Sequence, residues 1–112
     1  MQELPVINRT QELYEKVSII TEKLPALKQQ TIGRRLEDCI LQLLELCIMA
    51  KHAPKAHKGV YLIKASARAE IIQFQLRILL TQKLANETTL HQLQANTTEI
   101  GRMLGGWRKS VQ

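Results

Sequence analysis

Helix-breaking residues are rare in this sequence, and this scarcity constrains the fold more than any other feature. The turn signals in its 112 residues are Pro25, the polar stretch KHAPKAHKG around Pro54, and Asn86 with the residues after it. Between these breaks, apolar residues recur every three or four positions, as they do on a helix with one buried face. Three breaks therefore predict four helices joined by short loops.

Capping residues and prolines predict where these helices begin and end. Asn8, with Gln11 three residues later, predicts the start of the first helix, and Pro25 predicts its end. The stretch from Asn86 to Thr89 is predicted to supply caps for the last helix, with Thr89 and Gln92 as a capping box. The two middle helices are predicted over residues 27–51 and 60–84. Helices joined in this way form an up-down-up-down four-helix bundle, so we expect one all-α domain over residues 1–112.

The C-terminal stretch IGRMLGGWRKS combines three glycines, the only tryptophan and three cations. The predicted apolar seam of the last helix consists of Leu90, Leu93, Thr97, Ile100, Leu104 and Trp107. Trp107 is therefore predicted to pack in the core. Gly101 and Gly105 share a helix face and predict a close approach by another backbone, while the glycines at 105–106 predict a loosened last turn.

Two of the predicted helices carry more apolar surface than a one-sided bundle helix needs. Ten of the twelve residues at 39–50 are apolar, and so are eight of the twelve at 69–80. Surplus apolar surface commonly marks a protein interface, so the sequence predicts a homo-oligomer. The alternative is a single bundle with wide core stripes. The residues predicted to form the interface are Leu41, Leu44, Ile48, Ile71, Phe74 and Ile78.

The net charge of +6 lies entirely in the second half of the chain. Residues 1–51 hold seven Lys or Arg and seven Asp or Glu, whereas residues 52–112 hold nine and three. This asymmetry indicates a polyanionic partner, although the alternative is that it only aids solubility. The cations predicted to contact phosphates or a polymerase are Lys55, Lys58, Lys64, Arg68, Arg77, Arg102, Arg108 and Lys109. Glu70, seven residues before Arg77, is an acid that could neutralise it.

Catalytic and metal-binding patterns are absent from the sequence. Di-iron bundles need Glu-x-x-His pairs, but Glu87 and His91 are four residues apart. No nucleophile elbow, phosphate-binding loop or HExxH motif is present. We therefore expect no enzyme, cofactor or metal, with a metal-dependent bundle enzyme as the rival hypothesis. On helices of this kind Asp38 would pair with Arg34, four residues earlier.

Cysteine usage and the N-terminus predict a cytoplasmic protein. Cys39 and Cys47 would lie about 12 Å apart along one helix, too far to form a disulfide. The start MQELPVINRT has no basic segment followed by an apolar run, so it does not resemble a signal peptide. The apolar stretch at 39–50 is too short to cross a bilayer.

The segments TIGRRLEDCILQLLELCIMAKHA (31–53) and IGRMLGGWRKS (100–110) resemble a small four-helix-bundle family. This family includes Avd, the accessory variability determinant of diversity-generating retroelements, and the bundle proteins encoded by intervening sequences in bacterial 23S rRNA genes. The resemblance implies a non-catalytic, barrel-like homopentamer with a basic surface. Such a protein binds the retroelement reverse transcriptase and its template RNA or cDNA, and supports mutagenic retrohoming. The alternative is an intervening-sequence-type bundle that acts as a protein–protein scaffold.

Overall fold

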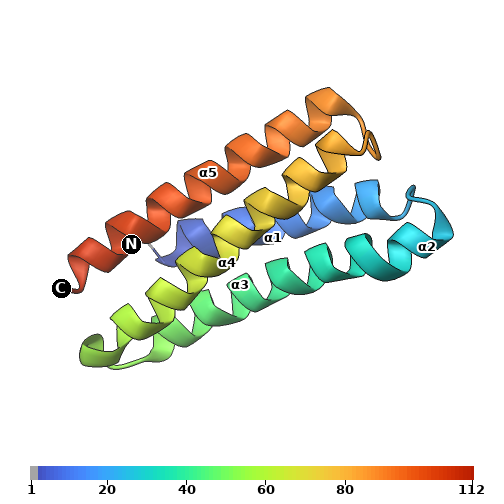
Figure 1. Ribbon diagram of the computed structural model, residues 1–112. Helices are drawn as coiled ribbons and strands as arrows, with labels where there is room; N and C mark the ends of the chain where they lie inside the picture. Colours follow the sequence, from blue (N-terminus) through green and yellow to red (C-terminus); the bar gives the residue numbers. More distant parts are fainter. Residues whose placement is uncertain (1–2) are drawn as a thin grey trace.

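The computed structural model describes residues 3–112, and the regular structure in this range is helical throughout (Figure 1). The four long helices are α1 (Glu3–Thr21), α3 (Arg34–His52), α4 (Lys55–Thr81) and α5 (Glu87–Ser110). A short helix α2 (Ala26–Lys28) and a π-helical turn η1 (Gln29–Gly33) lead into α3. Helices α1 and α4 each pack against both α3 and α5. The predicted all-α four-helix bundle is thereby confirmed.

The core of the bundle is largely aliphatic. Its largest fully buried side chains are Leu13, Leu36, Ile40, Leu43, Leu62, Ile72, Leu76, Leu79, Leu90, Leu93, Ile100 and Leu104. The predicted seam of α5 is buried along its whole length, and Trp107 is only 3% exposed. The buried Thr97 hydroxyl donates to the Leu93 carbonyl at 2.8 Å, so it adds no unpaired polar group to this seam.

The starts of α1 and α4 differ from the predicted ones. Helix α1 begins at Glu3, so Asn8 and Gln11 lie inside the helix and do not cap it. Pro5 falls in the first turn of α1, where a missing N–H removes no hydrogen bond. Helix α4 begins at Lys55, directly after Pro54, and so includes much of the stretch predicted as a loop.

The cap of α5 is Asn86, which belongs to the stretch predicted to supply it, whereas the predicted capping box at Thr89 and Gln92 is wrong. The Asn86 Oδ1 atom accepts a hydrogen bond from the Thr89 N–H at 3.0 Å. Thr89 is therefore the third residue of the helix, where its N–H still needs a partner. The side chain that supplies this partner lies three residues earlier than the capping-box pattern indicates.

The close approach predicted at Gly101 and Gly105 occurs instead at Gly33. A Cβ atom on Gly33 would lie 3.3 Å from the Leu24 Cδ1 atom and 3.4 Å from the Lys28 carbonyl oxygen. A Cβ atom on Gly101 or Gly105 would meet no atom of the described residues within 4 Å. The reason is rotational: each of these two glycines directly follows a seam residue and so lies about 100° away from the core. The last turn is not loosened either, because α5 stays helical to Ser110.

Substitutions at these glycines should act in opposite directions. Gly33→Val is expected to lower the free energy of unfolding by about 2 kcal/mol, because the added methyl groups overpack the junction between α1 and η1. Gly101→Ala is expected to raise it by up to about 1 kcal/mol, because the space is open and alanine favours helix. Urea denaturation measures both effects. Equal tolerance of the two substitutions would contradict the close packing at Gly33.

The turn between α4 and α5 contains Lys83 in the left-handed region, with φ of 55°. The Leu84 N–H donates to the Leu79 carbonyl at 3.0 Å, which is the long bond of a Schellman motif. Glycine adopts this conformation without the steric cost that a Cβ atom imposes. We expect Lys83→Gly to raise the free energy of unfolding by about 1 kcal/mol. The control Gln82→Gly, at a φ of −85°, should lower it in the same denaturation measurement.

Candidate polyanion-binding and assembly surfaces

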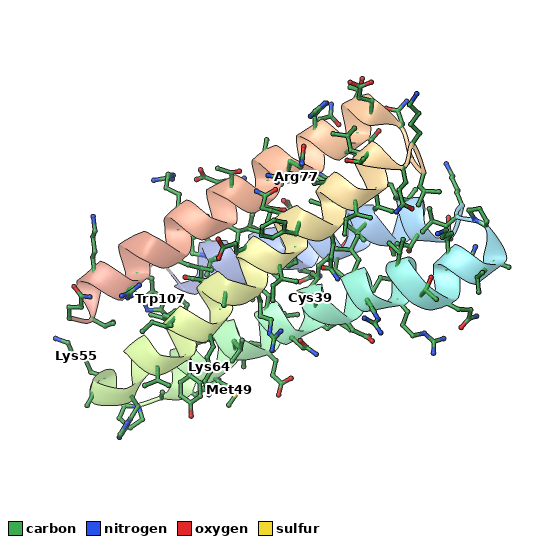
Figure 2. The ribbon with its side chains drawn as sticks, in the orientation of Figure 1. Cys39, Met49, Lys55, Lys64, Arg77 and Trp107 are labelled. Atoms are coloured by element: carbon green, nitrogen blue, oxygen red, sulfur yellow. The ribbon has the colours of Figure 1, made fainter. Side chains whose placement is uncertain are left out.

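One end of the bundle gathers positive charge from three helices. Helix α3 ends there, α4 starts there and α5 ends there (Figure 1). Figure 2 shows Lys55 at this end and Lys64 and Arg77 farther along α4. We define the basic end as Lys51, His52, Lys55, His57, Lys58, Arg108 and Lys109. No Asp or Glu occurs at 46–69 or at 100–112, so these two segments carry positive charge and no acid of their own.

The fold brings together four of the predicted cations, Lys55, Lys58, Arg108 and Lys109, at this basic end. Sequence reasoning missed Lys51, His52 and His57, which lie on either side of the α3–α4 turn. Lys51 belongs to the half of the sequence with no net charge, so charge counting by halves could not find it. In the sequence, the proximity of His52 and His57 to Pro54 was the signal that could have placed them at the α3–α4 turn.

Lys58 also has a structural task within the basic end. Its Nζ atom donates to the carbonyl oxygens of Ala50 at 2.7 Å and of Lys51 at 2.9 Å. These carbonyls belong to the last turn of α3, where a cation favours the negative end of the helix dipole. Lys55, Arg108 and Lys109 are exposed, and none of them takes part in an ion pair among the described residues.

The remaining predicted cations lie elsewhere and in different environments. Arg102 donates to Glu99 through Nε at 2.9 Å, and this hydrogen bond lowers the pKa of the Glu99 carboxyl. The Arg77 guanidinium lies 5.4 Å from the centre of the Phe74 ring and forms no ion pair with Glu70 within the described chain. Lys64 is exposed on α4, while Arg68 is half-buried.

An apolar stripe runs along the solvent-facing side of α4. We define the α4 stripe as Val60, Ile63, Ala67, Ile71, Phe74 and Ile78, all of them exposed. Phe74 is 54% exposed and Ile63 is 52% exposed. These values are high for side chains of this size outside an interface. Val60 and Ile63 were not predicted, although the three- and four-residue spacing of the stripe continues through them.

A second apolar patch lies on α3. Leu41 is 44% exposed and Ile48 is 42% exposed, whereas Leu44 is half-buried. Glu37, seven residues before Leu44, accepts a hydrogen bond from Thr21 of α1, so Leu44 lies on the side of α3 that faces α1. Five of the six residues predicted for an interface are therefore exposed in a single chain.

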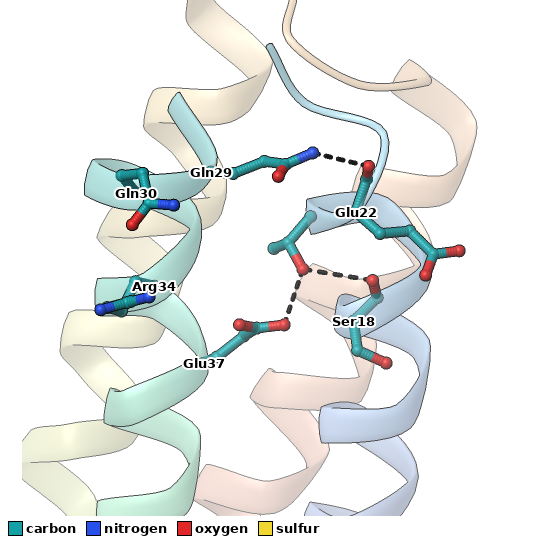
Figure 3. Close-up of a pocket in the computed structure, with 7 residues that line it drawn as sticks. Ser18, Glu22, Gln29, Gln30, Arg34 and Glu37 are labelled. Carbon is teal, nitrogen blue, oxygen red and sulfur yellow. Dashed lines mark hydrogen bonds between the residues drawn. The ribbon is translucent and has the colours of Figure 1, made fainter. Parts of the chain in front are cut away.

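A polar cleft of about 310 Å³ lies where η1 and α3 meet the end of α1 (Figure 3). It is lined by Ser18, Thr21, Glu22, Gln29, Gln30, Arg34 and Glu37. The Gln29 Nε2 atom donates to the Glu22 carbonyl at 2.7 Å and the Leu24 carbonyl at 2.9 Å. The Thr21 hydroxyl donates to Glu37 Oε2 at 2.7 Å. Because these polar groups bond to one another across the cleft, they tie α1 to the start of α3.

Two features of the described part of the chain bear on catalysis: its cysteines and its potential metal ligands. Burial raises the pKa of the Cys47 thiol to about 12. Burial also raises the pKa of Cys39, although the nearby charge of Arg68 opposes this effect. Both thiols are therefore disfavoured as nucleophiles. Within residues 3–112, no three His, Cys, Asp or Glu side chains gather as metal ligands.

Helices long and apolar enough to cross a membrane are absent from the described residues.

Fold and surfaces together define a small four-helix bundle with one basic end and an exposed apolar stripe. The chain belongs to the bAvd-like family, whose model matches residues 5–111. This match confirms the family that the two sequence segments indicated. A similar solved structure is the crystal structure of a protein of unknown function from the S23 ribosomal protein family of Bacteroides thetaiotaomicron. It aligns with a TM-score of 0.87 over 97% of this chain and 99% of its own, at 16% identity, which shows a shared fold. No functionally curated protein matches the sequence significantly.

Proposed function

We propose that this protein is a non-catalytic accessory subunit of a diversity-generating retroelement in the cytoplasm. It binds the reverse transcriptase and its template RNA or cDNA and supports mutagenic retrohoming. The observation that carries this proposal is the basic end, where cations from three helices gather without a neighbouring acid in the sequence. Membership of the bAvd-like family supports the same function.

Contacts to phosphates explain how such a surface works. Phosphate contacts give affinity and orientation without base selectivity. The chain has only four aromatic residues. Trp107 is buried, and Phe74, which is exposed, lies in the α4 stripe and not at the basic end. Binding by base stacking, which needs exposed aromatic side chains, is therefore disfavoured. The protein then acts by holding the template close to the polymerase and raising its local concentration.

Self-assembly is the second element of the proposal. The exposed apolar residues of α3 and α4 support a homo-oligomer, and family membership supports a pentamer. Each added copy contributes another basic end, so an oligomer binds a long polyanion more tightly through multivalency. The phosphate contacts proposed outside the basic end are Lys64, Arg68, Arg77 and Arg102.

The exposed apolar stripe also favours a second candidate function, a protein–protein scaffold of the intervening-sequence type. A scaffold needs the stripe but not the basic end. It therefore predicts partner binding that survives neutralisation of Lys55, Arg108 and Lys109, together with no affinity for RNA.

Fluorescence anisotropy with a labelled single-stranded RNA tests the proposed function. Affinity should fall by orders of magnitude between 50 and 200 mM salt, because each phosphate contact releases counterions. Co-purification with the reverse transcriptase and light scattering test the two partners. RNA affinity that is absent or independent of salt would contradict the polyanion function, and a monomer at micromolar concentration would contradict the oligomer.

A further inference from the structure

We propose that the reverse transcriptase docks in a groove between α1 and α5, through one amphipathic helix that carries an acidic residue beside a large apolar one. This inference rests on the proposed function, and it gives the reverse transcriptase a surface separate from the one that holds RNA. The surface, which we call the α1–α5 groove, lies between Lys16, Ile19 and Ile20 of α1 and Gln92, Leu93 and Asn96 of α5.

The α1–α5 groove has an apolar floor and an apolar ridge along one side. Leu93 is buried in the core, Ile20 packs against that core and is half-buried, and Ile19 is 54% exposed. An exposed apolar ridge beside an apolar floor is typical of a surface that a partner covers. The volume of the groove is about 230 Å³, below the roughly 300–1,000 Å³ of small-molecule sites. It therefore suits the side chains of a docked helix better than a free small molecule.

A single charged residue, Lys16, lines the groove. Lys16 is exposed and forms no ion pair with Glu12, one turn earlier, just as the expected pairing of Asp38 with Arg34 is not made. Glu99, the next acid along α5, is already paired with a neighbour on its own helix. One cation beside an apolar floor is complementary to a carboxylate next to a large apolar side chain. A phosphate chain needs several cations, so RNA fits this groove poorly.

The groove lies on a side of the bundle that the other proposed contacts leave free. Helix α1 packs against α3 and α5 and lies diagonally across from α4, so the α1–α5 side is opposite the α3–α4 side. The exposed apolar residues proposed for self-association belong to α3 and α4. Gln92 precedes Arg108 by sixteen residues on α5, so the groove lies about 24 Å from the basic end. Each copy can therefore hold template and reverse transcriptase at the same time.

Binding of the purified reverse transcriptase of the same retroelement to an Ile19→Glu variant tests the groove. Its affinity, measured by biolayer interferometry, should fall by about 30-fold, because the substitution places a carboxylate against the apolar side chain of the docked helix. RNA affinity and oligomeric state should not change. Ile19 is exposed, and circular dichroism checks that the variant folds. Leu27→Glu, at a leucine of α2 that is 73% exposed, is the matched control and should bind like the wild type.

Two further positions test the groove independently of Ile19. Gln92→Trp on α5 fills the groove and should weaken binding of the reverse transcriptase to a similar extent, with α1 unchanged. Lys16→Glu should weaken it by about tenfold at low salt and by less at high salt, because like charges then meet and salt screens them. Lys16→Arg should keep the wild-type affinity, since it keeps the charge.

Three results would overturn the inference and leave the proposed function standing. Wild-type affinity in either Ile19→Glu or Gln92→Trp would show that the reverse transcriptase docks elsewhere. An equal loss in Leu27→Glu would show that the effect is not specific to the groove. An altered oligomeric state in Ile19→Glu would show that the groove is a contact between copies. A wild-type protein that does not bind the reverse transcriptase would instead overturn the proposed function, and this inference with it.

Discussion

Replacing Lys55, Arg108 and Lys109 together with glutamine should weaken binding to single-stranded RNA by about 100-fold near 0.1 M salt. Each phosphate contact to a single strand contributes about 0.7 to the slope of log affinity against log salt, so three contacts contribute about 2. The slope measured by anisotropy should therefore fall by about 2 units in the variant. The three side chains are exposed and absent from the described ion pairs, so their removal should leave the fold intact.

A charge-matched variant distinguishes the basic end from net charge alone. Lys16, Lys23 and Lys83 are exposed and lie outside the basic end. Their joint replacement by glutamine removes the same three charges and should change affinity only slightly at 0.1 M salt, where distant charges are screened. Equal losses in the two triple variants would contradict a localised phosphate-binding surface.

Lys58 is left out of the triple variant for a structural reason. Its Nζ atom bonds to two carbonyl oxygens at the end of α3, so Lys58→Gln would alter the α3–α4 turn as well as the charge. A loss of RNA affinity in that variant would have two causes. Substitutions of the exposed cations therefore test RNA binding without changing the fold, whereas a substitution of Lys58 would change both.

Most of the helical architecture could be predicted from the spacing of apolar residues, because that spacing encodes which face is buried. The seam of α5, including Trp107, was predicted residue by residue and is buried. Helix starts were harder to predict, because a helix can extend through polar residues where no helix-breaking residue interrupts it. Helix α4 begins at Lys55, directly after its N-cap Pro54, where the sequence indicated a loop.

Glycine function depends on rotation about the helix axis, and sequence spacing does not fix this rotation to within one residue. Gly101 and Gly105 lie one position beyond the seam, where an added Cβ atom would meet no described atom within 4 Å. Gly33 lies in η1, and nothing in the sequence marked that segment as a π-helical turn. The contact of Gly33 with Leu24 depends on how α1 and η1 meet, which is a tertiary property.

The candidate surfaces, too, could be predicted from the sequence only in part. Surplus apolar residues could be counted from the sequence, and five of the six predicted interface residues are exposed. The charge asymmetry was also visible. The grouping of cations at one end was not visible. Lys51 and Arg108 are 57 positions apart in the sequence and come to the same end only because α3 and α5 both end there (Figure 1).

Trp107→Ala should lower the free energy of unfolding by about 3–5 kcal/mol, a large share of the roughly 5–15 kcal/mol that stabilises a domain. Trp107 is 3% exposed and belongs to the core cluster, so alanine would leave a cavity that the surrounding helices can close only in part. Because Trp107 is the only tryptophan, urea unfolding followed by circular dichroism is the suitable measurement.

Trp107→Phe is the matched control, and it should cost clearly less because most of the apolar volume remains. The buried ring also anchors the last turn of α5, which carries Arg108 and Lys109. RNA affinity of the alanine variant should therefore fall only under conditions where the end of α5 unfolds. A variant that loses RNA affinity at unchanged stability would instead place Trp107 in direct contact with the nucleic acid, and would contradict its assignment to the core.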